Sequence, residues 1–180
     1  MSEIHQEGFR LKMNPAGEKT CKIEFSPKLE QGYCNEVLPV LDEGPGRVNS
    51  NWELSSSGKG FSLSLNGRKV AAFSGPRKDP PANENEEEKV ERWLSFGQKV
   101  GEDTMVFGLG EKTRYLEKSG AVYEMWNRDA GGFYTHNEDP LYSTIPFYLL
   151  KNPENSASDF PFVGVYLHNS ERSRFAVKTG

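Results

Sequence analysis

The chain has 180 residues, of which 35% are hydrophobic and 12% aromatic, and its formal net charge is −4. A chain of this length buries roughly 70% of its unfolded surface, so we expect an ordinary core in which Phe, Tyr and Trp are prominent. Lysines and arginines are interspersed with acids. This mixture argues against a nucleic-acid partner, which needs a clustered basic face.

The N-terminal residues and the number of cysteines indicate where in the cell the protein is located. Residues 1–7 contain neither a basic start nor an apolar run, so they do not resemble a secretory signal. No segment approaches the roughly 20 apolar residues of a membrane helix. The two cysteines, Cys21 and Cys34, are fewer than a disulfide-stapled secreted domain usually carries, and we expect both to be reduced. These observations predict a cytoplasmic protein that does not contact a membrane.

The first half of the chain contains one strong hairpin signal. Residues 21–25 alternate weakly, whereas residues 61–65 alternate cleanly between apolar and polar and then meet Asn66-Gly67. Both turn residues tolerate positive φ, so the dipeptide favours a tight hairpin. Residues 70–73 form the expected returning strand.

The pattern breaks over residues 75–89, which contain three prolines and an acidic run at 84–88. We expect an exposed acidic, Pro-rich loop over 76–89. A cation site is the alternative interpretation, but the run lacks the Gly-centred spacing of a calcium loop.

The second half predicts further short strands and few helices. They are expected at 93–100, 104–109, 145–150, 162–167 and 174–177. Eight or more short strands at this spacing indicate an all-β protein built as an antiparallel β-sandwich. We assign residues 1–180 to one domain.

The segment Gly108-Leu109-Gly110-Glu111-Lys112-Thr113 resembles a phosphate-binding loop only superficially. A dinucleotide fingerprint needs glycine in place of Thr113, and a P-loop needs glycine directly before its lysine, where Glu111 stands. The glycines favour a structural interpretation, in which the backbone leaves a strand sharply and packs closely against a neighbour.

Residues 126–129, Trp-Asn-Arg-Asp, precede Gly131-Gly132 and predict a strand that ends in a loop presenting an acid. Asp129 could accept hydrogen bonds from vicinal sugar hydroxyls, or it could form an Asx-turn. Trp126 could stack on a pyranose ring, although a core position is the commoner role for tryptophan. Asp129, Arg128 and Trp126 are therefore the candidate substrate-binding residues.

Other polar residues predict no further site. His136, Glu138 and Asp139 are close in sequence, but their spacing is not that of metal ligands. No pair of carboxylates identifies itself as an acid/base couple. We expect neither a metal nor a cofactor.

Four segments in order resemble glycoside hydrolase family 31, the α-glucosidase family. They are Phe107-Gly108-Leu109-Gly110-Glu111-Lys112, then 123–129, then Asp139-Pro140-Leu141-Tyr142 with Ile145-Pro146-Phe147, and finally 164–170. The resemblance implies the family's N-terminal β-sandwich, similar to galactose mutarotase. It also implies that the last strands of the sandwich, and the following (β/α)₈ barrel with its two catalytic aspartates, lie beyond residue 180.

The resemblance implies a role for one residue. The family's N-terminal domain sends a loop to the mouth of the barrel, and Asp129 matches its substrate-binding acid. We thus expect the N-terminal domain of a retaining α-glucosidase, with an α-glucoside or maltooligosaccharide as substrate, the barrel of the same protein as partner, and a possible homo-oligomer. The Asp-Pro-Leu-Tyr segment favours α-glucosidases over α-xylosidases. The isolated chain should be inactive.

Two other functions remain open on the sequence. A stand-alone carbohydrate-binding module would use the aromatic-rich loop to bind glucose or maltose unaided. A mutarotase-like epimerase would need histidines and a carboxylate converging in a cleft, which three scattered histidines make a poor match.

Overall fold

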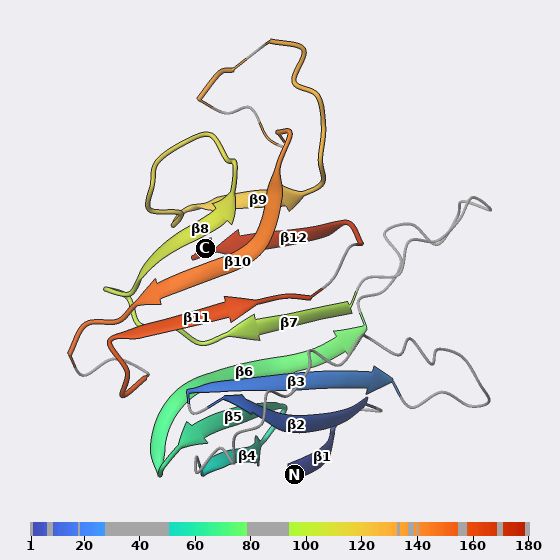
Figure 1. The fold of residues 1–180 in the computed structure, drawn as a ribbon, viewed down its shortest axis with the longest axis vertical. Coiled ribbons are helices and arrows are strands. Elements are labelled where there is room, and N and C mark those ends of the chain that lie inside the picture. Colours follow the sequence, from blue (N-terminus) through green and yellow to red (C-terminus); the bar gives the residue numbers. More distant parts are fainter. Residues whose placement is uncertain are drawn as a thin grey trace. The chain divides into compact units, whose positions relative to one another are not determined.

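The computed structural model describes residues 2–6, 9–17, 19–27, 51–78, 94–132, 134–136, 139, 141–154, 158–168 and 171–178. These residues form twelve strands and no helix. The chain divides into two compact units, Met1–Lys99 and Val100–Gly180, whose strands are labelled in Figure 1. Every strand pairing is antiparallel. The predicted all-β antiparallel class is therefore confirmed.

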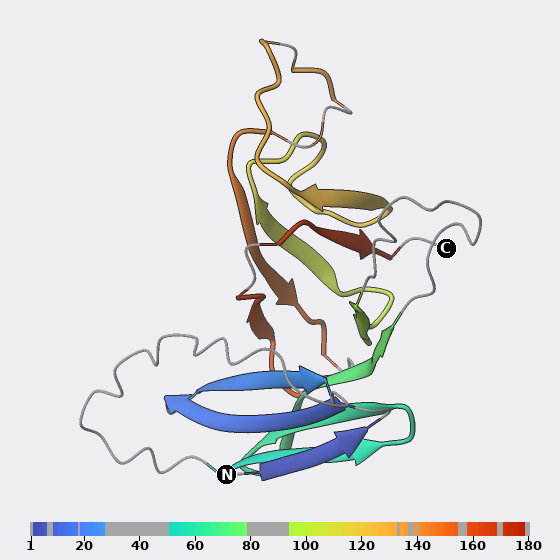
Figure 2. The same ribbon diagram turned by 90° about the vertical axis from the view of Figure 1, so that its right-hand side faces the viewer.

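The first unit contains two sheets. One has the order β1-β2-β3 and the other the order β4-β5-β6-β7, and Figure 2 shows them stacked face to face. Their strands are β1 (Ser2–Gln6), β2 (Phe9–Gly17), β3 (Thr20–Pro27), β4 (Trp52–Ser57), β5 (Gly60–Leu65), β6 (Arg68–Lys78) and β7 (Leu94–Gln98).

The core of this unit lies between its two sheets. Met13 of β2 is buried in the same cluster as Leu54, Phe61 and Phe73 of the other sheet. The rings of Phe61 and Phe73 stack with centroids 4.8 Å apart. Only two of the six buried residues in this cluster are aromatic, so aliphatic side chains contribute more to the described core than the composition predicts.

The hairpin between β5 and β6 confirms the prediction from Asn66-Gly67. Asn66 has φ 52° and Gly67 has φ 72°, the left-handed pair that a two-residue turn requires. Burial alternates along β5, with Leu63 and Leu65 facing the core. The two-residue period of the sequence therefore fixes both the turn and the buried face.

The end of β6 corrects one prediction. Residues 76–78, expected to begin a loop, continue the strand to Lys78. The pairing with β7 shifts register between Ser74 and Arg77, and this irregularity accommodates Pro76, which has no N–H for the ladder. The acidic run at 84–88 lies outside the described residues.

Cys21 of β3 is a free thiol, and burial raises its pKa to about 11. This agrees with the expectation of a reduced structural cysteine. Cys34 lies outside the described residues.

The second unit also contains two sheets, with the orders β11-β10-β8 and β12-β9. The strands are β8 (Met105–Gly110), β9 (Ala121–Met125), β10 (Thr144–Lys151), β11 (Phe162–Tyr166) and β12 (Ser173–Val177). Val106, Leu150 and Val163 are buried. Across the two sheets, the ring of Tyr148 meets Phe175 edge-on at 5.9 Å, and burial raises the pKa of Tyr148.

Most strands expected from the pattern are present, but β1, β2 and β4 were missed. Their sequences, SEIHQ, FRLKMNPAG and WELSSS, are rich in polar residues or contain proline. Pairing with neighbouring strands outweighs these weak local preferences. Within the described part of the chain, no helix has the length and apolarity needed to cross a membrane.

Candidate functional site

The candidate site is the segment between β9 and β10, which Figures 1 and 2 show projecting from the strands of the second unit. It contains the predicted residues Trp126, Arg128 and Asp129. Two neighbouring features position it: the glycine-rich end of β8 and a network of polar contacts at its base.

The end of β8 has an unusual backbone. Gly108, Leu109 and Gly110 have φ values of 106°, 70° and 78°. A Cβ on Gly108 would lie 2.6 Å from the Phe147 carbonyl oxygen, and one on Gly110 would lie 2.5 Å from the Ile145 nitrogen. Leu109 itself is fully buried. These contacts agree with the structural interpretation of the glycines, because they let β8 pack directly against the backbone of β10.

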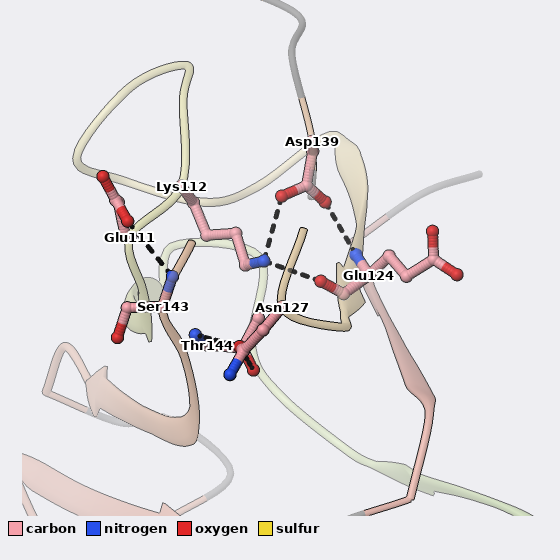
Figure 3. A network of polar contacts seen from close by, with 7 residues as sticks. All are labelled: Glu111, Lys112, Glu124, Asn127, Asp139, Ser143 and Thr144. Carbon is pink, nitrogen blue, oxygen red and sulfur yellow. Dashed lines mark hydrogen bonds and ion pairs between the residues drawn. The ribbon is translucent and has the colours of Figure 1, made fainter. Parts of the chain in front are cut away.

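A buried ion pair follows this turn (Figure 3). The Lys112 ammonium lies 2.9 Å from Asp139 Oδ1, and the Lys112 side chain is 0% exposed. Lys112 also donates to the Glu124 carbonyl oxygen at 2.6 Å, while Asp139 Oδ2 accepts from the Glu124 N–H at 2.7 Å. The pair therefore holds both backbone groups of one residue near the end of β9.

Hydrogen bonds between three further pairs of residues close the base of the segment. The Asn127 side-chain oxygen accepts from the Thr144 N–H at 2.9 Å and from the Thr144 hydroxyl at 2.8 Å. Glu111 accepts from the Ser143 N–H at 3.1 Å, as Figure 3 shows. The Arg128 N–H donates to the Leu141 carbonyl at 2.9 Å. We call the segment closed by these contacts, residues 126–143, the site loop.

Asp129 is held by two hydrogen bonds at the start of the site loop. Its Oδ1 accepts from the Gly131 N–H at 2.7 Å and from the Tyr142 hydroxyl at 2.6 Å. The first bond is the Asx-turn considered from the sequence. Both bonds use Oδ1, and none of the described bonds uses Oδ2. Asp129 therefore combines a structural role with an exposed carboxylate oxygen.

The electrostatics keep this carboxylate ionised. The hydrogen bond from Tyr142, followed by that from Gly131, lowers the pKa of Asp129. The same bond to Asp129 raises the pKa of Tyr142, so the phenol keeps its proton and remains a donor. Asp129 thus offers a negatively charged acceptor of the kind that binds hydroxyl groups.

The site loop carries three exposed aromatic side chains. Trp126 is 51% exposed, Tyr134 is 60% exposed and Tyr142 is 42% exposed. The two tyrosine rings are tilted by 46°, with centroids 6.4 Å apart. The core position considered for Trp126 is wrong, because Trp126 follows the end of β9 at Met125 and half of its surface is exposed.

The structure places the remaining sequence candidates as follows. Arg128 is exposed, and the described contact it makes is through its backbone. His136 packs edge-on against Tyr115 at 4.8 Å, and Asp139 pairs with Lys112. Glu138 lies outside the described residues. No group of potential metal ligands is found among the residues that the structure describes.

Removing the Tyr142 hydroxyl should raise the pKa of Asp129. In Tyr142→Phe, the carboxylate loses the stronger of the two hydrogen bonds that favour its charged form. The hydrogen bonds that lower this pKa also stabilise the folded protein. This stabilisation is fully present above the ordinary pKa of Asp and is lost as the pH falls through the lowered pKa. NMR titration of the Asp129 carboxyl carbon in both proteins measures the shift. Tyr166→Phe, on β11, is the matched control and should leave the Asp129 pKa unchanged.

Sequence reasoning missed Lys112, Asp139 and Tyr142 as parts of the site. All three lie in the quoted family motifs, which was the available signal. Their roles require contacts between residues 13 to 27 positions apart, which spacing alone does not provide.

The comparisons with known proteins agree with this fold. Residues 2–175 match the family model described as the glycosyl hydrolase 31 N-terminal galactose mutarotase-like domain. The chain therefore belongs to this family, as its motifs predicted.

Two curated relatives match less than half of the chain. "Alpha-glucosidase 2" of Bacillus thermoamyloliquefaciens is 30% identical over 73 residues, which are 41% of this chain and 8% of that protein. "Alpha-xylosidase XylQ" of Lactiplantibacillus pentosus is 31% identical over 78 residues, 43% of this chain and 8% of that protein. The chain thus spans a small part of both relatives, and their similar identities do not separate the two activities.

The fold is also similar to solved structures of a Flavobacterium johnsoniae GH31 dextranase. The complex with glucose has a TM-score of 0.58 at 21% identity and covers 94% of this chain and 21% of the dextranase. A mutant complexed with isomaltotriose has the same score and identity, covering 96% and 22%. These likenesses show the shared fold.

Proposed function

We propose that this chain is the domain of a family 31 glycoside hydrolase that contributes the site loop to a carbohydrate-binding site. The observation that carries the proposal is Asp129, an exposed, ionised carboxylate near the start of a loop whose base is held by hydrogen bonds. Family membership supplies the glycosidase context. Bond cleavage is assigned to a catalytic barrel elsewhere in the same polypeptide.

In this proposal Asp129 accepts hydrogen bonds from substrate hydroxyls through Oδ2. Its other oxygen is already bonded to Tyr142 and Gly131, so the carboxylate does not have to be ordered when the sugar binds. Trp126 offers an exposed ring that can cover an apolar sugar face. Arg128 offers a cationic donor beside them.

The substrate we propose is a terminal α-linked glucose of a small oligosaccharide, in a retaining α-glucosidase. The Asp-Pro-Leu-Tyr segment supports this choice over an α-xyloside. The structure gives that segment a concrete role, since Asp139 anchors the site loop and Tyr142 holds Asp129.

A comparison of two aryl glycosides tests the proposal. The full-length protein that carries this chain should hydrolyse 4-nitrophenyl α-glucoside with a higher kcat/KM than 4-nitrophenyl α-xyloside. Residues 1–180 alone should hydrolyse neither. Preference for the xyloside would contradict the substrate assignment, and turnover by residues 1–180 would contradict the assignment of catalysis to another domain.

The exposed rings of Trp126, Tyr134 and Tyr142 favour a second candidate, a stand-alone carbohydrate-binding module. Aromatic faces beside a carboxylate can bind sugar without a catalytic partner. This candidate requires residues 1–180 to bind maltose unaided at millimolar affinity or better. Calorimetric titration of residues 1–180 with maltose tests this candidate, and the absence of binding heat would contradict it.

A further inference from the structure

The buried pair Lys112–Asp139 has no place among the groups that we propose to contact substrate. Its ammonium is inaccessible to solvent, and its carboxylate is 12% exposed. A buried ion pair is weak evidence for stability, because desolvating two charges offsets much of their attraction. We therefore infer the role of this pair from the groups that it contacts and not from a contribution to stability.

Those contacts join the two ends of the site loop. Lys112 and Asp139 bind the carbonyl and the N–H of Glu124, which lies two residues before Trp126. Asp139 itself lies three residues before Tyr142. One ion pair thus connects the strand that enters the loop with the segment that returns from it (Figure 3).

The residues at both ends of this connection are close to Asp129, one in sequence and one through a hydrogen bond. On the entering side, Glu124 is five residues before it. On the returning side, the Tyr142 hydroxyl binds the carboxylate directly at 2.6 Å. Asp139 thus lies three residues before the side chain that holds the Asp129 carboxylate.

We propose that Lys112 and Asp139 are positioning residues, which set substrate affinity by fixing where the site loop presents Asp129. The inference rests on the proposed function of the site loop and adds a role for two residues that do not touch substrate. Small errors in the position of a binding group cost a large part of its effect. The pair therefore acts on affinity through Asp129.

A double-mutant cycle in the full-length protein tests the inference, with 4-nitrophenyl α-glucoside as the probe. Lys112→Met should lower kcat/KM by about tenfold, mainly through KM, in the presence of Asp129. In the Asp129→Ala background, Lys112→Met should lower kcat/KM by less than about twofold, because the carboxylate that Lys112 positions is absent. Equal effects in the two backgrounds would overturn the inference and leave the proposed function standing.

Two further variants separate positioning from loss of folding. Val163→Ala removes buried side-chain volume from β11 in the same unit, and it should lower the melting temperature while leaving KM unchanged. Asp139→Asn keeps the acceptor oxygen for the Glu124 N–H, so it should raise KM less than Lys112→Met does. A KM that follows melting temperature across all three variants would overturn the inference.

Hydrogen exchange supplies a readout that does not depend on activity. The amides of Arg128 and Gly131, which are bonded within the site loop, should exchange faster in Lys112→Met, while those of β5 and β6 should not change. Unchanged exchange at Arg128 and Gly131 would overturn the inference. A normal kcat/KM in Asp129→Ala would instead overturn the proposed function, together with the role that rests on it.

Discussion

Asp129→Ala should lower kcat/KM for an α-glucoside by about 10–100-fold in the full-length protein. The substitution removes one or two charge-assisted hydrogen bonds to substrate, which contribute roughly 1.5–3 kcal/mol each. It also leaves the Tyr142 hydroxyl without the carboxylate it now binds. Steady-state kinetics of wild-type and variant enzymes measure the change, which we expect mainly in KM.

Two variants make this prediction specific. Asp129→Asn keeps an oxygen that can accept from Tyr142 and Gly131, so it separates loss of charge from loss of loop structure. Glu154→Ala removes a negative charge from an exposed position elsewhere in the same unit, and it should leave kcat/KM unchanged. Wild-type kinetics in Asp129→Ala would exclude Asp129 from the site.

Gly110→Ala should destabilise the second unit by roughly 2–5 kcal/mol. The left-handed backbone at φ 78° costs a residue with a Cβ about 1–2 kcal/mol. The new atom would also lie 2.5 Å from the Ile145 nitrogen and 2.9 Å from the Ser143 oxygen, and relieving such overpacking adds about 1–3 kcal/mol. Chemical unfolding followed by circular dichroism measures the loss.

Gly120→Ala is the matched control for this substitution. Gly120 has φ 79°, nearly the same as Gly110, but no atom lies within 4 Å of the position its Cβ would take. Its cost should therefore be only the backbone contribution of about 1–2 kcal/mol. Equal losses in the two variants would mean that the close approach of β8 to β10 contributes nothing.

The Gly110→Ala experiment also tests a structural role for the glycines of the Phe107–Lys112 family motif. Gly108 and Gly110 lie where β8 meets β10, and Lys112 and Asp139 lie at the base of the site loop. The motif residues are thus adjacent in the fold although more than 25 positions separate them in sequence.

The sequence by itself determined the fold class and much of the strand pattern. Alternation over 61–65 followed by Asn66-Gly67 is local information, because turn geometry and side-chain period depend on adjacent residues. The same applies to the strand that ends near Met125 and the loop after it. The ordered motifs were sufficient to identify the family, and residue 129 as its candidate acid.

Only the tertiary structure decided how that acid is held and what surrounds it. The bond from Tyr142 to Asp129, the pairing of Lys112 with Asp139 and the exposure of Trp126 all depend on where β8, β9 and β10 bring distant residues together. Burial and hydrogen bonding are properties of such contacts and not of residue types. For this reason the sequence left open whether Trp126 lies in the core or at the surface, where the structure places it, and did not predict that the side chain of Lys112 is buried.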